Sequence, residues 1–205
     1  MPIDIIIVRH GSTEWNEKER FRGLADLSLS ELGFRQAEAT SARLADMPVK
    51  KIYASPLRRA MQTAVIIGRP HNIQPVALDG IIDINFGKFQ GLSFPEAEAA
   101  YPDIFHQWMN NPHLVTLPEG ENLAQVRERS SSALDEIISG LEDGTVIFVS
   151  HKVVITTLVC HYLGMDDSKF RQIEMDTCAI NTFNRQSDNI YAVMLNDTCH
   201  LAGVK

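Results

Sequence analysis

An apolar run near the N-terminus is the feature that most restricts how this chain can fold. Ile3 to Val8 is short, rich in β-branched residues and followed directly by Arg9-His10-Gly11. A run that is apolar at consecutive positions is typical of a strand buried on both faces, as in a parallel sheet covered by helices. The run therefore predicts a central strand of an α/β fold, with Arg9 and His10 at its carboxyl end.

Strand and helix signals alternate along the rest of the chain. Further strands are predicted at 51–54, 76–78 and 145–149, with a closing pair at 179–184 and 190–195. Helices are predicted at 31–45, 57–68, 123–140 and 153–163, from their periodicity and from capping residues such as Ser30 and Pro56. This order predicts a three-layer α/β sandwich, with a mostly parallel central sheet flanked by helices.

The segment 86–121 interrupts this alternation with several aromatic residues and four prolines. We expect a small helical insertion over the active site, in which most aromatic side chains form a core of their own. The pattern also allows a few of them to line a substrate pocket. Because no repeat, low-complexity tract or charge block divides the 205 residues, positions 1–205 are predicted to form one domain that contains this insertion.

Charge, cysteine content and hydropathy exclude several classes of function. A net charge of −7 argues against binding of nucleic acid or of an anionic membrane. The three cysteines lack metal-ligand spacing, so neither a disulfide framework nor a metal site is predicted. No apolar run approaches the ~18 residues that span a bilayer, and the first one is too short for a secretory signal. We therefore expect a cytoplasmic protein.

Three of the predicted strands end in residues that carry chemistry. The first is followed by Arg9-His10-Gly11, the second by Ser55-Pro56-Leu57-Arg58-Arg59, and the strand at 145–149 by Ser150-His151-Lys152. Ligands of open α/β sheets bind beyond the carboxyl ends of the strands. Two histidines and at least two arginines are therefore predicted on one rim.

These residue types suit phosphoryl transfer. A neutral imidazole can attack phosphorus, and forked guanidinium groups match the charge spread over the phosphoryl oxygens. Gly11 is expected to let the backbone approach the phosphate. Arg58 and Arg59 lie ~100° apart on a helix, so only one of them is expected to face the site. The histidines away from the strand ends are interpreted as structural: His71, His106, His113 and His161.

Six ordered blocks of the sequence resemble the histidine phosphatase superfamily, which contains phosphoglycerate mutases and many small-molecule phosphatases. The blocks are VRHGSTEWN (8–16), RFRGLADLSLSELGFRQA (20–37), YASPLRRAMQTA (53–64), INFGKFQG (84–91), PEGENLAQVRER (118–129) and VSHK (149–152). The resemblance covers nearly the whole chain in the expected order. It implies that His10 accepts the phosphoryl group and that Arg9, Arg59 and His151 bind it. Arg59 matches the family arginine because it directly precedes Ala60.

The resemblance also implies contacts around the phosphate and the rest of the substrate. Asn16 is expected to be a further contact on the phosphate side, and Arg22 and Gly23 lie in the segment that approaches the substrate in relatives. Lys152 replaces the glycine that commonly follows the second histidine. It either reaches toward a distal charge of the substrate or points to solvent.

The proton donor is the main departure from the family pattern. Relatives have a glutamate two residues before the xFGxxxG block, and this chain has Asp83 there. Aspartate is one methylene shorter and is ordinarily ionised at neutral pH. An acid role therefore requires burial or nearby negative charge, a low pH optimum or a good leaving group. The alternative interpretation of Asp83 is a carboxylate in a surface turn.

The residues and the resemblance together predict a phosphatase that hydrolyses a small-molecule phosphomonoester through phosphohistidine, without a metal or other cofactor. The alternatives are a phosphoglycerate mutase dependent on 2,3-bisphosphoglycerate and a catalytically silent phosphate-binding module. Hydrolysis is favoured because the acid-containing motif and the insertions of the mutases are absent.

The identity of the ester stays open among sugar phosphates, phosphoserine, 3-phosphoglycerate, bisphosphates and α-ribazole phosphate. Specificity is expected from the segment 86–121 and from the C-terminal segment Asn196 to Leu201. The resemblance is also compatible with a homodimer.

Overall fold

The centre of the molecule is a six-stranded sheet in the order β3-β2-β4-β1-β5-β6. The computed structural model describes residues 3–187 and 189–204. The strands are β1 (Ile3–Arg9), β2 (Val49–Ala54), β3 (Val76–Ala77), β4 (Gly144–Ser150), β5 (Ile180–Gln186) and β6 (Asn189–Asp197). β1 to β4 pair in parallel, whereas β5 runs antiparallel to β1 and to β6. The predicted mostly parallel sheet is therefore confirmed, although β3 is only two residues long.

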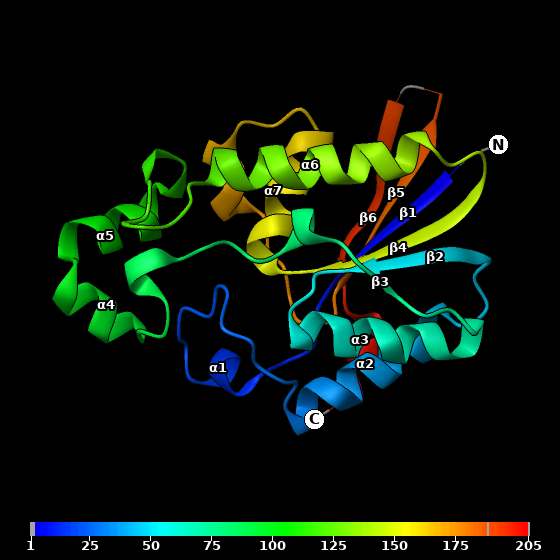
Figure 1. Ribbon diagram of the computed structural model, residues 1–205, viewed down its shortest axis with the longest axis horizontal. Coiled ribbons are helices and arrows are strands. Elements are labelled where there is room, and N and C mark those ends of the chain that lie inside the picture. The colour runs from blue at the N-terminus through cyan, green and yellow to red at the C-terminus, as the bar shows by residue number, and fades with distance from the viewer. Residues whose placement is uncertain (1–2, 188, 205) are drawn as a thin grey trace.

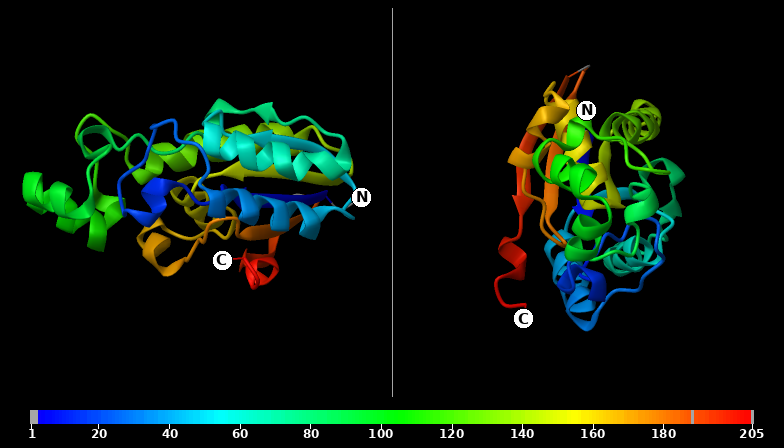
Figure 2. Two further views of the ribbon diagram at one scale, coloured as in Figure 1. Left: turned by 90° about the horizontal axis from the view of Figure 1, so that it is seen from below. Right: turned by 90° about the vertical axis from the view of Figure 1, so that its left-hand side faces the viewer.

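Helices cover both faces of this sheet (Figure 1, Figure 2). They are α1 (Glu14–Glu17), α2 (Glu31–Leu44), α3 (Arg58–Gly68), α4 (Phe94–Ala100), α5 (Pro102–Asn110), α6 (Leu123–Ser139) and α7 (Lys152–Tyr162). α2 packs against α3 on one face, and α6 packs against α7 on the other. The four predicted helices are confirmed to within one residue at each end. In the described part of the chain, no helix is both long and apolar enough to cross a membrane.

The side chains of β1 explain why its apolar run is continuous. Ile5 and Ile7 pack into the core that contains Val154 of α7, whereas Ile6 and Val8 pack into the core formed with α3. Successive side chains of a strand point to opposite faces, so a strand with a helix layer on each side must be apolar at every position. All four of these β1 side chains are at most 1% exposed.

The insertion lies beyond the carboxyl ends of the parallel strands, with α4 and α5 at its tip (Figure 1). It extends past the carboxyl ends of the strands and does not cover a face of the sheet. Its aromatic residues surround Phe21, whose ring centroid lies 5.0 Å from that of Phe86, 5.1 Å from Phe89 and 4.9 Å from Phe94. The predicted aromatic core is confirmed, but Phe21 belongs to it from outside the segment 86–121.

Two glycines hold the loop after β1 against the start of α2. A Cβ atom on Gly33 would lie 2.0 Å from the carbonyl oxygen of Ser12, and one on Gly11 would lie 2.5 Å from the carbonyl oxygen of Gly33. The backbone N–H of Ser30, which caps α2, donates to the same Ser12 oxygen at 2.9 Å. Gly11 therefore has a packing role that the sequence did not indicate.

Replacing Gly33 with alanine is expected to lower the free energy of unfolding by about 1–3 kcal/mol, because the new methyl group overlaps the Ser12 carbonyl. Gly140→Ala is the matched control, since the nearest atom to its Cβ would be 3.6 Å away. Its effect should stay within about 0.5 kcal/mol. Urea unfolding measures both changes, and equal values would contradict the close packing at Gly33.

Candidate active site

The register between β1 and β4 brings two histidines together. Arg9 lies opposite Ser150, and the backbone N–H of His10 donates to the carbonyl oxygen of Ser150 at 2.9 Å. His10 follows Arg9 in β1, and His151 follows Ser150 in β4. The ring centroids of the two histidines are 5.1 Å apart. Both rings are at most 1% exposed. The predicted convergence of these two strand ends is confirmed.

His10 is held as a neutral ring in one tautomer. Its Nδ1 lies 2.7 Å from the carbonyl oxygen of Gly11, which can only accept a hydrogen bond. Nδ1 therefore carries the proton, and in the neutral ring the lone pair is on Nε2. Burial, followed by the charges of Arg59 and Arg9, holds the pKa of His10 well below its ordinary value of 6.5. This is the form that a nucleophilic histidine requires.

His151 lies between a hydroxyl group and a carboxylate. Its Nε2 is 2.7 Å from Oγ of Ser55, the residue that follows β2, and its Nδ1 is 3.5 Å from Oδ2 of Asp83. Nδ1 has no hydrogen-bond partner in the protein. Burial and then Arg59 lower the pKa of His151 well below its ordinary value. Ser55 was missed as a site residue, although its place directly after a strand could have indicated it.

Arg59 is completely buried and is the best connected of the arginines in the site. It donates to the carbonyl oxygens of Gly23 at 2.8 Å and Ala25 at 2.7 Å, and to Oδ2 of Asp83 at 2.9 Å. Arg58 points away and forms an ion pair with Asp26 at the surface. The structure thus places Arg59 in the site and Arg58 outside it.

Gly23 supports the site from behind. Its φ of +48° and the Ile84 carbonyl oxygen, 2.9 Å from where a Cβ would lie, restrict this position to glycine. Its carbonyl oxygen binds Arg59, but Gly23 does not line the cavity described below. The structure therefore gives Gly23 a supporting role, and its predicted contact with the substrate stays a prediction.

Three guanidinium groups are concentrated around the histidines. Burial lowers the pKa of Arg22 and Arg59, and burial together with the charge of Arg22 lowers that of Arg9 to about 10. The Nε atoms of all three are buried and have no hydrogen-bond partner in the protein. Desolvated cations with unused donors are a strong indication of an anion site.

Asp83 is buried, as its expected role requires, but its neighbours are not those predicted. Its exposed fraction is 5%, so the alternative of a surface turn is wrong. Oδ2 accepts from Arg59, and Oδ1 accepts from the backbone N–H of Ile84 at 2.9 Å. The expected negative neighbours are replaced by an arginine because Arg59 reaches this loop from α3.

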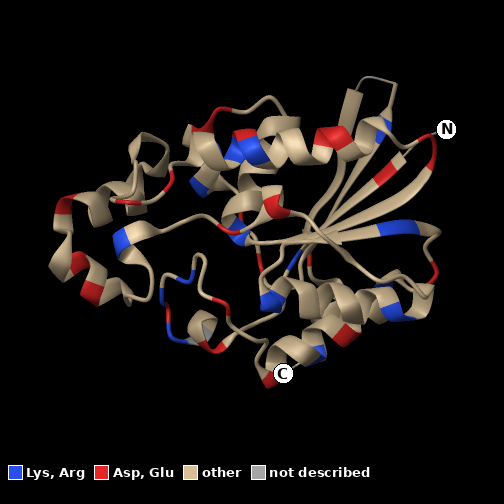
Figure 3. Ribbon diagram, viewed as in Figure 1, with Lys and Arg blue, Asp and Glu red and all other residues tan. Residues whose placement is uncertain are grey.

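A cavity of about 270 Å³ opens above this cluster. Five of the predicted residues line it: Arg9, Asn16, Arg22, Asp83 and Lys152. Its aromatic walls are Phe21, Phe86, Phe94, Trp108 and Phe170, and its further charged residues are Glu19, Arg20 and Arg171. Basic positions from several segments gather at this end of the sheet, in a chain of net charge −7 (Figure 3). An anion is therefore attracted locally.

Two of the cavity residues have defined orientations. Oδ1 of Asn16 accepts from the backbone N–H and the hydroxyl group of Thr13, at 3.0 and 2.8 Å, which leaves its Nδ2 group as the donor. Lys152 is the first residue of α7, and its Nζ lies 3.6 Å from Oε2 of Glu174.

Other predicted contributors lie elsewhere. The C-terminal segment Asn196 to Leu201 packs behind the site, where His200 Nε2 lies 3.0 Å from Oγ1 of Thr40 on α2. It does not line the cavity, and its expected contribution to specificity stays a prediction. The four histidines interpreted as structural also lie outside the cavity wall. Within residues 3–187 and 189–204, no group of three His, Cys, Asp or Glu could hold a metal ion.

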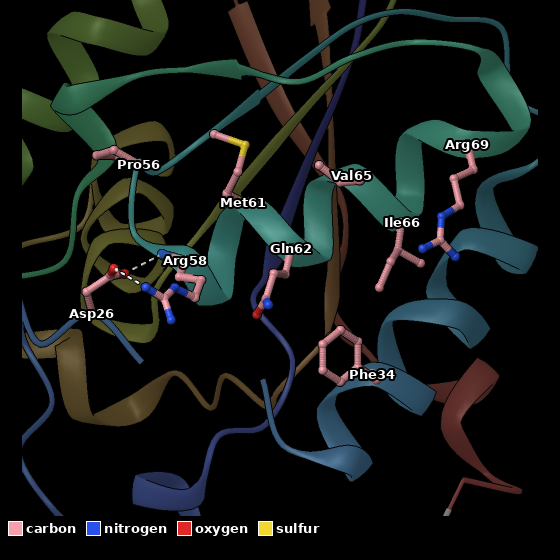
Figure 4. A pocket seen from close by; sticks show the side chains of 9 residues that line it. All are labelled: Asp26, Phe34, Pro56, Arg58, Met61, Gln62, Val65, Ile66 and Arg69. Carbon is pink, nitrogen blue, oxygen red and sulfur yellow. Dashed lines mark hydrogen bonds and ion pairs between the residues drawn. The ribbon is translucent and has the colours of Figure 1, made fainter. Parts of the chain in front are cut away.

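A second groove lies between α2 and α3 (Figure 4). Its volume is about 410 Å³, and its walls include Phe34, Met61 and Val65, with the Asp26–Arg58 ion pair at one end. It contains none of the residues predicted for catalysis.

Comparison with known proteins gives a consistent result. Residues 5–198 match the model of the histidine phosphatase superfamily (branch 1). The chain is 35% identical over 199 residues to phosphoserine phosphatase 1 of Hydrogenobacter thermophilus, covering 97% of this chain and 94% of that one. The structure of Bacillus stearothermophilus YhfR superposes with a TM-score of 0.92 at 26% identity, over 97% of this chain and 99% of that one. Phosphoserine phosphatase from Entamoeba histolytica, in complex with 3-phosphoglyceric acid, gives 0.87 at 25%, over 97% and 99%.

The two buried histidines predict how stability depends on pH. Below the ordinary pKa of 6.5 the unfolded chain takes up protons at His10 and His151, whereas the native rings stay neutral. The unfolded state then binds more protons, so the free energy of unfolding falls as the pH falls, by up to about 1.4 kcal/mol per pH unit for each histidine.

Urea unfolding between about pH 6.5 and pH 5, in phosphate-free buffer, measures this slope. The single variant His10→Gln should have a smaller slope than the wild type, and the double variant His10→Gln/His151→Gln a smaller one still. An unchanged slope in the double variant would show that the native rings are protonated.

Proposed function

The chain belongs to the histidine phosphatase superfamily, and on this basis we propose that it hydrolyses a small phosphomonoester through a phosphohistidine formed at His10. The observation that carries the proposal is the set of three buried guanidinium groups with unused Nε donors around a neutral imidazole. Membership of the family and the phosphatase relatives both support hydrolysis.

The first step transfers the phosphoryl group to the protein. Nε2 of His10 attacks phosphorus in line, the new N–P bond forms, and the P–O bond to the leaving group breaks. Arg9, Arg22 and Arg59 surround the transferring group and match its charge. Such preorganised donors stabilise the transition state without reorganising.

Asp83 supplies the proton that the leaving oxygen needs. A bound phosphoryl group competes for Arg59 and so weakens the contact between Arg59 and Oδ2 of Asp83. The proton can arrive with the substrate, because a phosphomonoester keeps one proton below its second pKa of about 6. Asp83 passes it to the leaving oxygen and afterwards takes a proton from the water that attacks phosphohistidine.

His151 acts as a neutral donor in this scheme. Its Nδ1 has no protein partner, and its Nε2 is held by the Ser55 hydroxyl group. This contact restricts rotation of the ring while the phosphoryl group passes between His10 and the leaving oxygen. Asn16 Nδ2 adds a second neutral donor at the cavity wall.

The cavity supports a substrate with an anionic end and a compact body. Phe86 occupies the wall with 8% exposure and packs edge-on against Phe21 and Trp108. Farther from His10, Arg171 and Lys152 offer cationic groups to a second negative charge. Phosphoserine and 3-phosphoglycerate are the first esters to test, because they carry such a charge and appear in the names of similar proteins. A cytoplasmic location is part of the proposal, supported by three cysteines that are all free thiols.

Replacing His10 with alanine is expected to lower phosphate release at least about 10³-fold and to abolish an acid-labile, hydroxylamine-insensitive phosphoenzyme. Arg59→Met should cost about 10²- to 10³-fold, because it removes a charged donor from the transition state. Arg58→Met is the matched control on the same helix and should change the rate less than about threefold. Full turnover by His10→Ala would exclude the phosphohistidine.

The same assay separates hydrolysis from mutase activity. Phosphate release and isomerisation of 3-phosphoglycerate are measured in parallel, with and without 2,3-bisphosphoglycerate. We expect phosphate release to dominate. Isomerisation that is faster than phosphate release would identify a mutase instead.

A further inference from the structure

Side chains from other elements bind the backbone of the loop that carries Asp83. Four consecutive carbonyl oxygens, those of residues 80–83, each accept a hydrogen bond from a side chain. Arg129 Nη1 donates to the first and third at 2.9 and 2.8 Å, and Arg129 Nη2 donates to the fourth, that of Asp83, at 3.1 Å. Oγ of Ser150 donates to the second at 2.8 Å. One arginine from α6 thus binds three of the four.

Arg129 is itself held in place by Glu121. Its Nε lies 2.8 Å from Oε1 and its Nη2 lies 3.1 Å from Oε2 of that carboxylate. Oε2 also accepts from the backbone N–H of Asn85 at 2.8 Å. The Glu121–Arg129 pair therefore contacts the loop on both sides of Asp83. Gly80 lets the loop lie close to α6, because a Cβ on Gly80 would lie 2.4 Å from Cβ of Ala133 on that helix.

The length of the Asp83 side chain makes this backbone support important. An aspartate has only one methylene between its backbone and its carboxyl group, so the backbone position largely determines where the carboxyl oxygens lie. Arg59 holds Oδ2, but Arg59 is also a phosphate ligand in the proposed scheme. When a phosphoryl group engages Arg59, the contacts from Arg129 to the backbone stay in place. Proton transfer is sensitive to displacements of this kind.

We infer that Arg129 is a positioning residue that holds the Asp83 loop so that its carboxyl group meets the leaving oxygen, an inference that rests on the proposed function. Arg129 acts through the backbone of the loop and makes no contact with the substrate. Its side chain is 23% exposed and is absent from the cavity wall. The pair Glu121–Arg129 extends this effect to the loop at the end of the insertion.

The readout follows from what a general acid does. A good leaving group such as p-nitrophenolate needs little protonation, whereas phenolate, which has nearly the same shape, needs more. Loss of acid catalysis therefore lowers the rate for phenyl phosphate more than for p-nitrophenyl phosphate, and general damage to the site lowers both. The ratio of the two kcat/KM values reports on the first transfer, in which Asp83 is the acid, and does not depend on the later hydrolysis of phosphohistidine, in which Asp83 is the base.

The experiment compares Arg129→Met with Arg127→Met in the full chain. Arg127 is on the same helix and pairs with Asp167 at 3.2 Å, so it is matched in type and ion pairing. We expect Arg129→Met to lower kcat/KM for phenyl phosphate about 10- to 100-fold and that for p-nitrophenyl phosphate less than about threefold. Arg127→Met should leave the ratio unchanged. In an Asp83→Asn background, Arg129→Met should add less than about twofold, because it acts through Asp83.

Equal losses for both esters, or full additivity with Asp83→Asn, would overturn the inference and leave the proposed function intact. Failure of the proposed function would give a different result, because the wild type would then hydrolyse neither ester through a phosphoenzyme. If Arg129→Met does not fold, as judged by thermal unfolding, the same ratio is measured for Arg129→Lys and Glu121→Gln. Each should shift the ratio in the same direction by a smaller factor, and an unchanged ratio in both would overturn the inference.

Discussion

The parallel pairing of β1 with β4 is the constraint on which the site depends. It sets Arg9 opposite Ser150, so that the residues after the two strands, His10 and His151, meet at ring contact. A shift of one residue in either strand would exchange the faces of its side chains and also separate the histidines. Since β1 is apolar and buried on both faces, the exchange of faces alone would bury the same kind of side chains. The shift would, however, place the charged Arg9 in the core. The same apolar packing that stabilises the sheet therefore fixes the position of His10, the proposed nucleophile.

The cost of burying three guanidinium groups is offset in part by backbone carbonyl oxygens. Arg9 donates to Met175, Arg22 to Trp15, and Arg59 to Gly23 and Ala25. Asp83 supplies one negative charge through Arg59, and the unused Nε donors are left for a ligand. The same positive charges lower the pKa of His10, which keeps the attacking ring neutral. Binding of an anion and readiness of the nucleophile thus have one physical cause.

The sequence is informative where the signal is local and ordered. The run Ile3 to Val8 predicted a buried strand, and residues placed directly after strands predicted the meeting of His10 with His151. The Arg59–Asp83 ion pair, the Ser55–His151 hydrogen bond and the packing of Phe21 were missed, because each joins positions that no short-range pattern relates. The position of the C-terminal segment was not predicted, for the same reason. Its contact with Thr40 on α2 depends on the path of the chain after β6.

The family glutamate is replaced by Asp83, and tertiary contacts determine whether the shorter side chain can take the same role. A shorter side chain loses reach, and Oδ2 is already engaged by Arg59, so both features work against contact with a leaving oxygen. The structure answers the first with the backbone support from Arg129 and Ser150. The second is answered only when a phosphoryl group competes for Arg59. In the proposed scheme Asp83 becomes available as the acid when the substrate binds, and without a substrate it pairs with the buried Arg59.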